Sequence, residues 1–147
     1  MEIEGLIKEW ESIFDREGDF YIYGAALSAK KTLKGAYKTG VGDRIKGFVV
    51  TDIEENVTEL EGLPVYDIHH FKDKDINVLV YHKGYIKEDI CQLLEELGFF
   101  NIYLISKYAQ HIWLENPRPV SDEYMERANQ RKKELFEKRT ELEKQPD

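Results

Sequence analysis

Apolar residues near the N-terminus recur at steps of three and four positions. They are Ile3, Leu6, Ile7, Trp10, Ile13 and Phe14. This spacing predicts an amphipathic helix that packs one face against the rest of the protein and ends near Gly18. The aromatic and β-branched residues from 20 to 23 then predict a short strand, which stops at Gly24.

Helical spacing returns after Gly24 and continues to Tyr37. The pattern predicts a strand, a tight turn and a helix in succession, and the helix is expected to give way at Gly40. Residues 45–50 are again rich in β-branched and aromatic side chains, which predicts a second strand. The acidic segment 53–61 has no sustained periodicity, so we expect a surface loop there.

The second half of the chain continues this alternation. Short strands are predicted at Val65-Tyr66, over 76–81 and over 102–105. The run 76–81 is dense in β-branched residues and alternates little with polar ones, so both of its faces are expected to be covered. Apolar residues at helical spacing over 86–97 predict a helix, which Gly98 is expected to end.

The alternation of strands and helices fills nearly all of residues 20 to 106. Strands that alternate with helices imply parallel pairing, because each crossover returns the chain to the same edge of the sheet. We therefore expect an α/β fold with a three-layer, Rossmann-like, open and mainly parallel sheet. An N-terminal helix and a charged C-terminal helix are added to it.

The composition changes after Pro117 and Pro119. Ser121 is suited to cap a helix whose first turn is acidic, and apolar positions become sparse beyond it. Oppositely charged residues four positions apart predict a solvated helix, a dimer arm or the start of a linker. We therefore divide the chain into a Rossmann-like domain with its N-terminal helix, 1–116, and a charged helical tail or linker, 117–147.

The 147 residues carry a formal net charge of −8. This charge repels phosphate-rich surfaces, and we find no concentration of positive charge in the sequence, so we expect no nucleic-acid or membrane partner. No stretch approaches the roughly 20 apolar residues that span a bilayer. The start, Met1 to Glu4, lacks the features of a signal peptide, and Cys91 is the only cysteine. We expect a cytoplasmic protein.

The turn after the first predicted strand is the main candidate for chemistry. A helix that follows a tight turn directs free backbone N–H groups and the positive end of its dipole at a ligand. Gly24, Ala26 and Ala29 occupy the positions of a G-x-G-x-x-G/A fingerprint, with alanine in place of the second glycine. A phosphate-bearing ligand is expected here, the alternative being a structural strand–helix junction. The expected binding residues are Gly24, Ala25, Ala26, Leu27 and Ser28.

Further candidates lie after other strands. Asp52 follows the second strand, where a dinucleotide-binding fold places the acid that accepts hydrogen bonds from a ribose, and loop capping is the alternative. Thr51 is a second candidate at that position. His82 follows the fourth strand and is a candidate general base or sugar contact, the alternative being a polar residue in an ordinary strand–helix loop. His69 and His70 are adjacent and cannot readily chelate a metal from one regular element, so we expect no metal site.

Three segments together resemble a known class of domain. They are Gly24-Ala25-Ala26, Ile45-Lys46-Gly47-Phe48-Val49-Val50-Thr51-Asp52 and Leu60-Glu61-Gly62-Leu63-Pro64-Val65-Tyr66. The pattern resembles the Rossmann-like nucleotide-binding domains of bacterial surface-polysaccharide biosynthesis proteins, and it is also similar to CoA-binding and Rex-type NAD-binding domains. The resemblance implies a nucleotide, nucleotide-sugar, NAD(P) or CoA ligand over Gly24 to Ser28.

Three functions are compatible with these features. The first is a binding module of a surface-glycan pathway, which holds a nucleotide, nucleotide-sugar or dinucleotide while another domain or subunit does the chemistry. The second is a small sugar-nucleotide oxidoreductase or epimerase, which requires an acid/base pair that the sequence does not offer. The third is a ligand-free interaction or regulatory domain, which uses its first helix and its charged tail to assemble. For each of the three functions, the first helix and the C-terminal helix are the candidate contacts for a homodimer or for a fused or partner catalytic domain.

Overall fold

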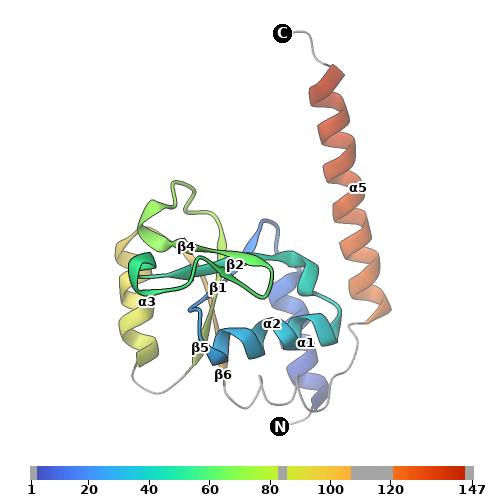
Figure 1. The fold of residues 1–147 in the computed structure, drawn as a ribbon. Coiled ribbons are helices and arrows are strands. Elements are labelled where there is room, and N and C mark those ends of the chain that lie inside the picture. The colour runs from blue at the N-terminus through green and yellow to red at the C-terminus, as the bar shows by residue number, and fades with distance from the viewer. Residues whose placement is uncertain (1–2, 83–85, 107–120, 145–147) are drawn as a thin grey trace.

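The computed structural model describes residues 3–82, 86–106 and 121–144. Within these residues six strands form one sheet, in the order β3-β4-β2-β1-β5-β6 (Figure 1). The strands are β1 (Phe20–Tyr23), β2 (Ile45–Val50), β3 (Glu59–Leu60), β4 (Leu63–Asp67), β5 (Asn77–His82) and β6 (Asn101–Ser106). Every adjacent pair is parallel except β3 with β4, which is antiparallel.

Four helices accompany the sheet in the described part of the chain. They are α1 (Ile3–Phe14), α2 (Leu27–Thr39), α3 (Ile86–Glu96) and α5 (Asp122–Lys144). The predicted succession of helices and strands is confirmed, and α2 and α3 end at glycines with positive φ, Gly40 and Gly98, as expected. The prediction of a loop over 53–61 is wrong at its end, because β3 pairs with the start of β4 across a turn at Glu61-Gly62.

The sheet order reverses at β1. From β1 the chain moves outward through β2 to β4, and it then crosses to the other side of β1 to add β5 and β6. Such a reversal is a topological switch point, and open α/β sheets bind ligands beside it, at the carboxyl ends of the strands. The structure is a mixed α/β fold with a mostly parallel sheet, consistent with a Rossmann-like fold.

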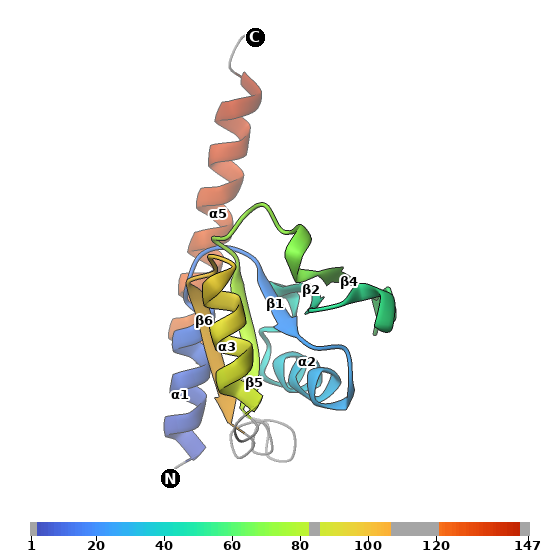
Figure 2. The same cartoon turned by 90° about the vertical axis from the view of Figure 1, so that its left-hand side faces the viewer.

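Two clusters of buried apolar side chains pack against opposite faces of the sheet. In β1, Ile22 belongs to the first cluster and Tyr21 packs against the second, because successive side chains of a strand point to opposite faces. α2 contributes Leu33 to the first cluster, together with residues of α1 and α5, whereas α3 contributes Leu94 to the second. Figure 2 shows α2 and α3 on the two sides of the strands accordingly.

The connection from β2 to β4 lacks an α-helix, since residues 51–62 form only a 3₁₀ turn and β3. Three aromatic rings pack together on the face of the sheet that α3 shares. Their centroids are separated by 5.1 Å for Tyr21 and Phe71, 5.5 Å for Tyr66 and Phe71, and 6.0 Å for Tyr21 and Tyr66. A Cβ at Gly47 would lie 2.7 Å from the carbonyl oxygen of Pro64 and 3.2 Å from the Tyr66 ring, so this close packing requires glycine.

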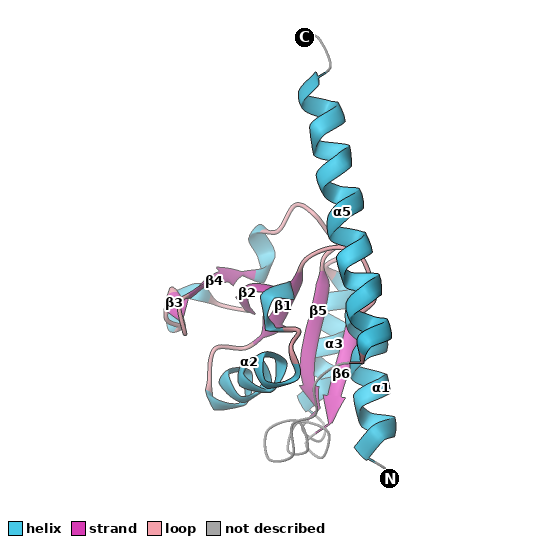
Figure 3. Cartoon of the chain, turned by 90° about the vertical axis from the view of Figure 1, so that its right-hand side faces the viewer, coloured by secondary structure: helices cyan, strands magenta, loops and turns pink. Residues whose placement is uncertain are grey.

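The last helix, α5, begins against α1 and then extends away from the rest of the molecule (Figure 3). Near its start, Tyr124 is only 2% exposed and belongs to the first core cluster, whereas Phe136 is 71% exposed. The first turns of α5 are therefore part of the core, and only the later turns match the predicted solvated helix. The predicted boundary at 116–117 lies outside the described residues. None of the helices described here combines the length and apolar composition needed to cross a bilayer.

Candidate functional site at the carboxyl edge of the sheet

The predicted site residues follow strands that are neighbours in the sheet. β1 lies between β2 and β5, and all three strands are parallel. Gly24 comes directly after β1, Thr51 comes after β2, and His82 is the last residue of β5. The fold therefore brings the predicted turn, Thr51 and the backbone of His82 to one edge of the sheet, beside the switch point. The side chain of His82 lies outside the described structure.

The turn after β1 depends on Gly24. Its φ is +108°, a conformation that L side chains rarely adopt, and its N–H donates a hydrogen bond of 2.8 Å to the carbonyl oxygen of Val49 in β2. A Cβ at this position would meet only the Ala29 side chain, at 3.9 Å. Glycine is therefore required here by the backbone conformation rather than by crowding.

The helix α2 starts immediately beyond this turn, without a side-chain cap. Ala26 is its N-cap residue, in an extended conformation, and its carbonyl oxygen accepts the bond from the Lys30 N–H at 3.1 Å. The N–H groups in the first turn of any helix lack acceptors within the helix itself, and the helix dipole adds positive potential there. This geometry suits an anion such as a phosphate group.

Ala29 occupies the third small position of the predicted fingerprint. It is 1% exposed and belongs to the same core cluster as Ile22 of β1 and Phe48 of β2. In dinucleotide-binding turns the third small residue permits close packing of helix and strand. Ala29 has the burial that this role requires, whereas Ala26 is exposed at the surface.

The two candidates after β2 already take part in local hydrogen bonds. The Thr51 hydroxyl is hydrogen-bonded to the Tyr23 hydroxyl, which links the ends of β1 and β2. Asp52 accepts a hydrogen bond of 3.0 Å from the Glu54 N–H through Oδ1 and thereby caps the 3₁₀ turn Ile53–Glu55. Of the two roles expected for Asp52, Oδ1 therefore has the loop-capping one in this structure.

A carboxylate–imidazole pair at the end of β4 was not among the sequence predictions. Asp67 Oδ1 lies 2.8 Å from His69 Nδ1 and also accepts a hydrogen bond of 2.8 Å from the His69 N–H. The backbone hydrogen bond from His69 lowers the pKa of Asp67 against the opposing effect of burial. The sequence feature that could have predicted this pair is an acidic residue, Asp67, two positions before a histidine, His69, at the end of a strand. In the described ranges no three His, Cys, Asp or Glu side chains gather closely enough to hold a metal ion.

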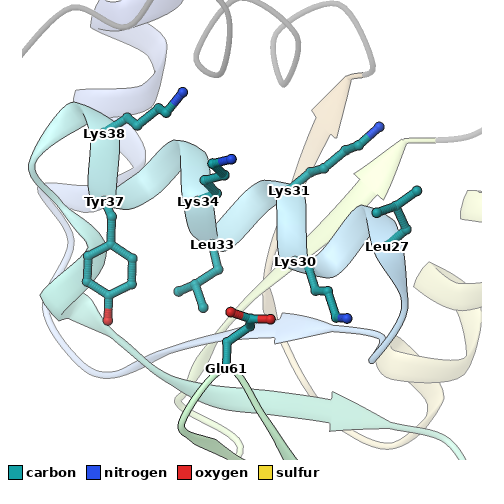
Figure 4. A pocket seen from close by; sticks show the side chains of 8 residues that line it. All are labelled: Leu27, Lys30, Lys31, Leu33, Lys34, Tyr37, Lys38 and Glu61. Atoms are coloured by element: carbon teal, nitrogen blue, oxygen red, sulfur yellow. The ribbon is translucent and has the colours of Figure 1, made fainter.

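A groove of about 740 Å³ runs along α2, between this helix and the turn that joins β3 to β4 (Figure 4). Its lining residues are Leu27, Lys30, Lys31, Leu33, Lys34, Tyr37, Lys38 and Glu61. The expectation that the chain has no concentration of positive charge is therefore wrong for this helix, because lysines spaced by three and four positions lie along one side of it. The signal was visible in α2, which contains four lysines and no acidic residue.

Comparison with known proteins assigns neither a family nor a function to this site. No family model, curated protein or solved structure is significantly similar to the chain.

Proposed function

We propose that this protein is a cytoplasmic binding module for a nucleotide, nucleotide-sugar or dinucleotide. The turn from Gly24 to Ser28 holds the phosphate group of this ligand. In this proposal the chain is a three-layer Rossmann-like domain, and another domain or subunit carries out any reaction. Assignment to a bacterial surface-glycan pathway is supported only by the resemblance of the segments around Gly24, Asp52 and Pro64.

One observation carries the proposal. Gly24 adopts a positive φ, and the uncapped N-terminus of α2 follows it at the carboxyl edge, directly beside the point where the strand order reverses. A turn that only joined a strand to a helix would need the glycine, but it would gain from a capping side chain. Ser, Thr, Asp or Asn at the N-cap stabilises a helix by about 1 kcal/mol relative to alanine. Ala26 at the N-cap supplies no side-chain acceptor, and a phosphate suits the positive end of the helix dipole at this position.

The neighbouring side chains define what else the ligand can contact. Thr51 and Asp52 follow the adjacent strand, and the cap formed by Asp52 uses Oδ1. A ribose hydroxyl that donates to Oδ2 is therefore compatible with the capped conformation. NAD(P) or a nucleotide-sugar supplies both groups, a diphosphate for the turn and a ribose for the acid.

Thermal denaturation of the full chain tests this proposal. A ligand that binds only the folded state raises the melting temperature by mass action. We expect a rise with millimolar NAD, NADP, a UDP-sugar or CoA, and no rise with adenosine or uridine, which lack phosphate. Failure of all the phosphate-bearing compounds, or an equal response to the nucleosides, would reject a phosphate site at the turn.

A further inference from the structure

The two edges of the sheet differ in how they are protected from other strands. β3, at one edge, has only two residues and includes Glu59. β6, at the other edge (Figure 2), has six residues that all pair in register with β5. Natural edge strands avoid unwanted pairing by being short or by carrying charges, prolines or bulges. β3 is short and charged, whereas β6 has none of these features.

The side chains of β6 have the exposure of an open edge. In the neighbouring β5, residues 78–80 are at most 1% exposed. In β6, Leu104 is 40% exposed and residues 101–103 are only partly buried. Phe100, directly before the strand, is 67% exposed. Two apolar side chains, near the two ends of this edge, are therefore in contact with solvent.

The outer edge of β6 also carries backbone groups that can pair. An edge strand presents a row of unpaired N–H and C=O groups, and an extended segment is the partner that satisfies such a row. Among the described residues no strand lies beyond β6. β6 contains no charged residue, so it can lie opposite a second β6 without bringing like charges together.

We infer that a second copy of this chain docks at this edge, by antiparallel pairing of β6 with its counterpart about a two-fold axis at Ile102. This register places Phe100 of each copy opposite Leu104 of the other. The exposed apolar side chains of the two edges then cover each other across the strands. An axis at Tyr103 would instead place Phe100 opposite Ser106. The match selects a second copy as the occupant, because β6 itself supplies, at the required spacing, the apolar residue that each exposed side chain lacks.

This contact differs from the predicted dimer contacts through the first helix and the C-terminal helix. Both copies use the same surface, so the contact is isologous and closes at a dimer. The two sheets then join into one, and neither copy keeps an open β6 edge. Each copy carries a net charge of −8, which opposes association, so salt should strengthen the dimer by screening this repulsion.

Light scattering after size-exclusion chromatography, and sedimentation velocity, test the inference on the full chain. We expect the average mass to rise with concentration to that of a dimer and no further. The rise should begin at a lower concentration in about 1 M salt than in about 0.1 M, because the Debye length falls from about 10 Å to about 3 Å. A monomer mass up to about 1 mM protein at both salt concentrations, or growth beyond the dimer, would overturn the inference.

Two substitutions test the register of the pairing. Leu104→Lys and, separately, Phe100→Glu should each weaken the dimer roughly tenfold or more, since each places a charge opposite an apolar side chain at both ends of the contact. An equimolar mixture of the two variants should associate again. The mixed dimer brings the new lysine opposite the new glutamate at one end and keeps the apolar pair at the other. A dimer that either variant leaves unchanged, or absence of this recovery, would reject the pairing.

A matched control makes the same change at another exposed aromatic ring. Phe136→Glu alters a side chain on the distal part of α5 that is 71% exposed, and it should leave the dimer unchanged. Loss of association in this control would assign the contact to α5 and overturn the inference. Hydrogen exchange of the parent protein is independent of any variant. The backbone amides of β6 should exchange more slowly in the dimer, and unchanged exchange there would place the contact elsewhere.

Discussion

Asp15, directly after α1, and Arg131, in α5, form an ion pair with 2.9 Å between Oδ1 and Nη1, although they are 116 positions apart. Arg127 donates from Nε to both oxygens of the same carboxylate, at 3.0 and 2.8 Å. Arg131 also donates to the carbonyl oxygens of Phe14 and Asp15, at 3.2 Å each. These bonds satisfy carbonyl groups that the last turn of α1 leaves without helical partners, and they hold α5 on α1.

Replacement of Asp15 by asparagine should destabilise the protein by roughly 1 to 2 kcal/mol at pH 7, because partly exposed hydrogen bonds between charged groups are lost. Urea denaturation measures the change. Glu137→Gln is a control, since it removes an exposed carboxylate of α5 away from the first turn and should change the free energy of unfolding by less than about 0.5 kcal/mol. Equal effects of the two substitutions would contradict a specific role of Asp15.

The stabilisation by Asp15 should depend on pH in a defined direction. Burial acts to raise the pKa of Asp15, but the hydrogen bonds and charges of Arg127 and Arg131 outweigh burial and hold the pKa below its ordinary value. A carboxyl group whose pKa is lowered by folding stabilises fully above its unfolded pKa, about 3.9, and loses this contribution as the pH falls through the folded-state pKa. The difference between the parent protein and Asp15→Asn should therefore stay constant between about pH 5 and 7 and shrink below about pH 4. A difference that grows on acidification would contradict this sign.

Tyr124 and Phe136 lie on the same helix but should differ in their importance for stability. Tyr124→Ala removes a ring that is 2% exposed, and it should cost about 3 to 5 kcal/mol. Phe136→Ala removes a ring that is 71% exposed, and it should change stability by less than about 0.5 kcal/mol. Urea denaturation of both variants tests whether only the first turns of α5 belong to the folded core.

The buried hydrogen bond from Trp10 Nε1 to Thr39 Oγ1, 2.7 Å long, joins α1 to the end of α2. Thr39→Val keeps the shape of the side chain but removes the acceptor, so the indole N–H loses this partner. We expect a loss of about 1 to 3 kcal/mol in the free energy of unfolding. Thr39→Ser, which retains the hydroxyl, should cost less, and the reverse ranking would show that packing of the methyl group matters more than the hydrogen bond.

Gly24 provides a test of the proposed phosphate site with a matched control. Gly24→Ala and Gly62→Ala each place a side chain at a positive φ, +108° and +79°, and both should cost roughly 1 to 3 kcal/mol of stability. Only Gly24 precedes the N-terminus of α2, so only Gly24→Ala should weaken binding of a phosphate-bearing ligand. Isothermal titration calorimetry measures the affinity, and an equal loss in both variants would place the ligand elsewhere.

Asp52 separates ribose recognition from phosphate recognition. Asp52→Asn retains an oxygen that can cap the Glu54 N–H but replaces the carboxylate with an amide. We expect affinity for a ribose-bearing diphosphate to fall roughly tenfold, with affinity for inorganic pyrophosphate unchanged, since about 1.4 kcal/mol is the scale of one hydrogen bond to a charged group. Unchanged affinity for both compounds would assign Asp52 to loop capping alone.

The order of helices and strands could be predicted from the sequence because it depends on local periodicity and on glycine. The apolar spacing of α1, the β-branched run of β5 and the glycines that end α2 and α3 all act within a few residues. The turn at Gly24 belongs to the same category, because a strand, a glycine and a helix follow one another directly. The exception was β3, a strand of two residues whose pairing with β4 leaves almost no pattern in the sequence.

Contacts between distant segments were decided only by the tertiary structure. Asp15 shows no sequence signal for its two arginine partners, because oppositely charged residues are common throughout the chain and only packing of α1 against α5 selects this set. The same holds for Asp52, whose position after β2 was predictable but whose capping bond depends on the conformation of the next three residues. The sequence by itself therefore determined the elements and the position of the turn, through local backbone preferences. Packing between elements determined the sheet order, the burial of Tyr124 and the gathering of lysines beside Tyr37, because these depend on which surfaces meet in three dimensions.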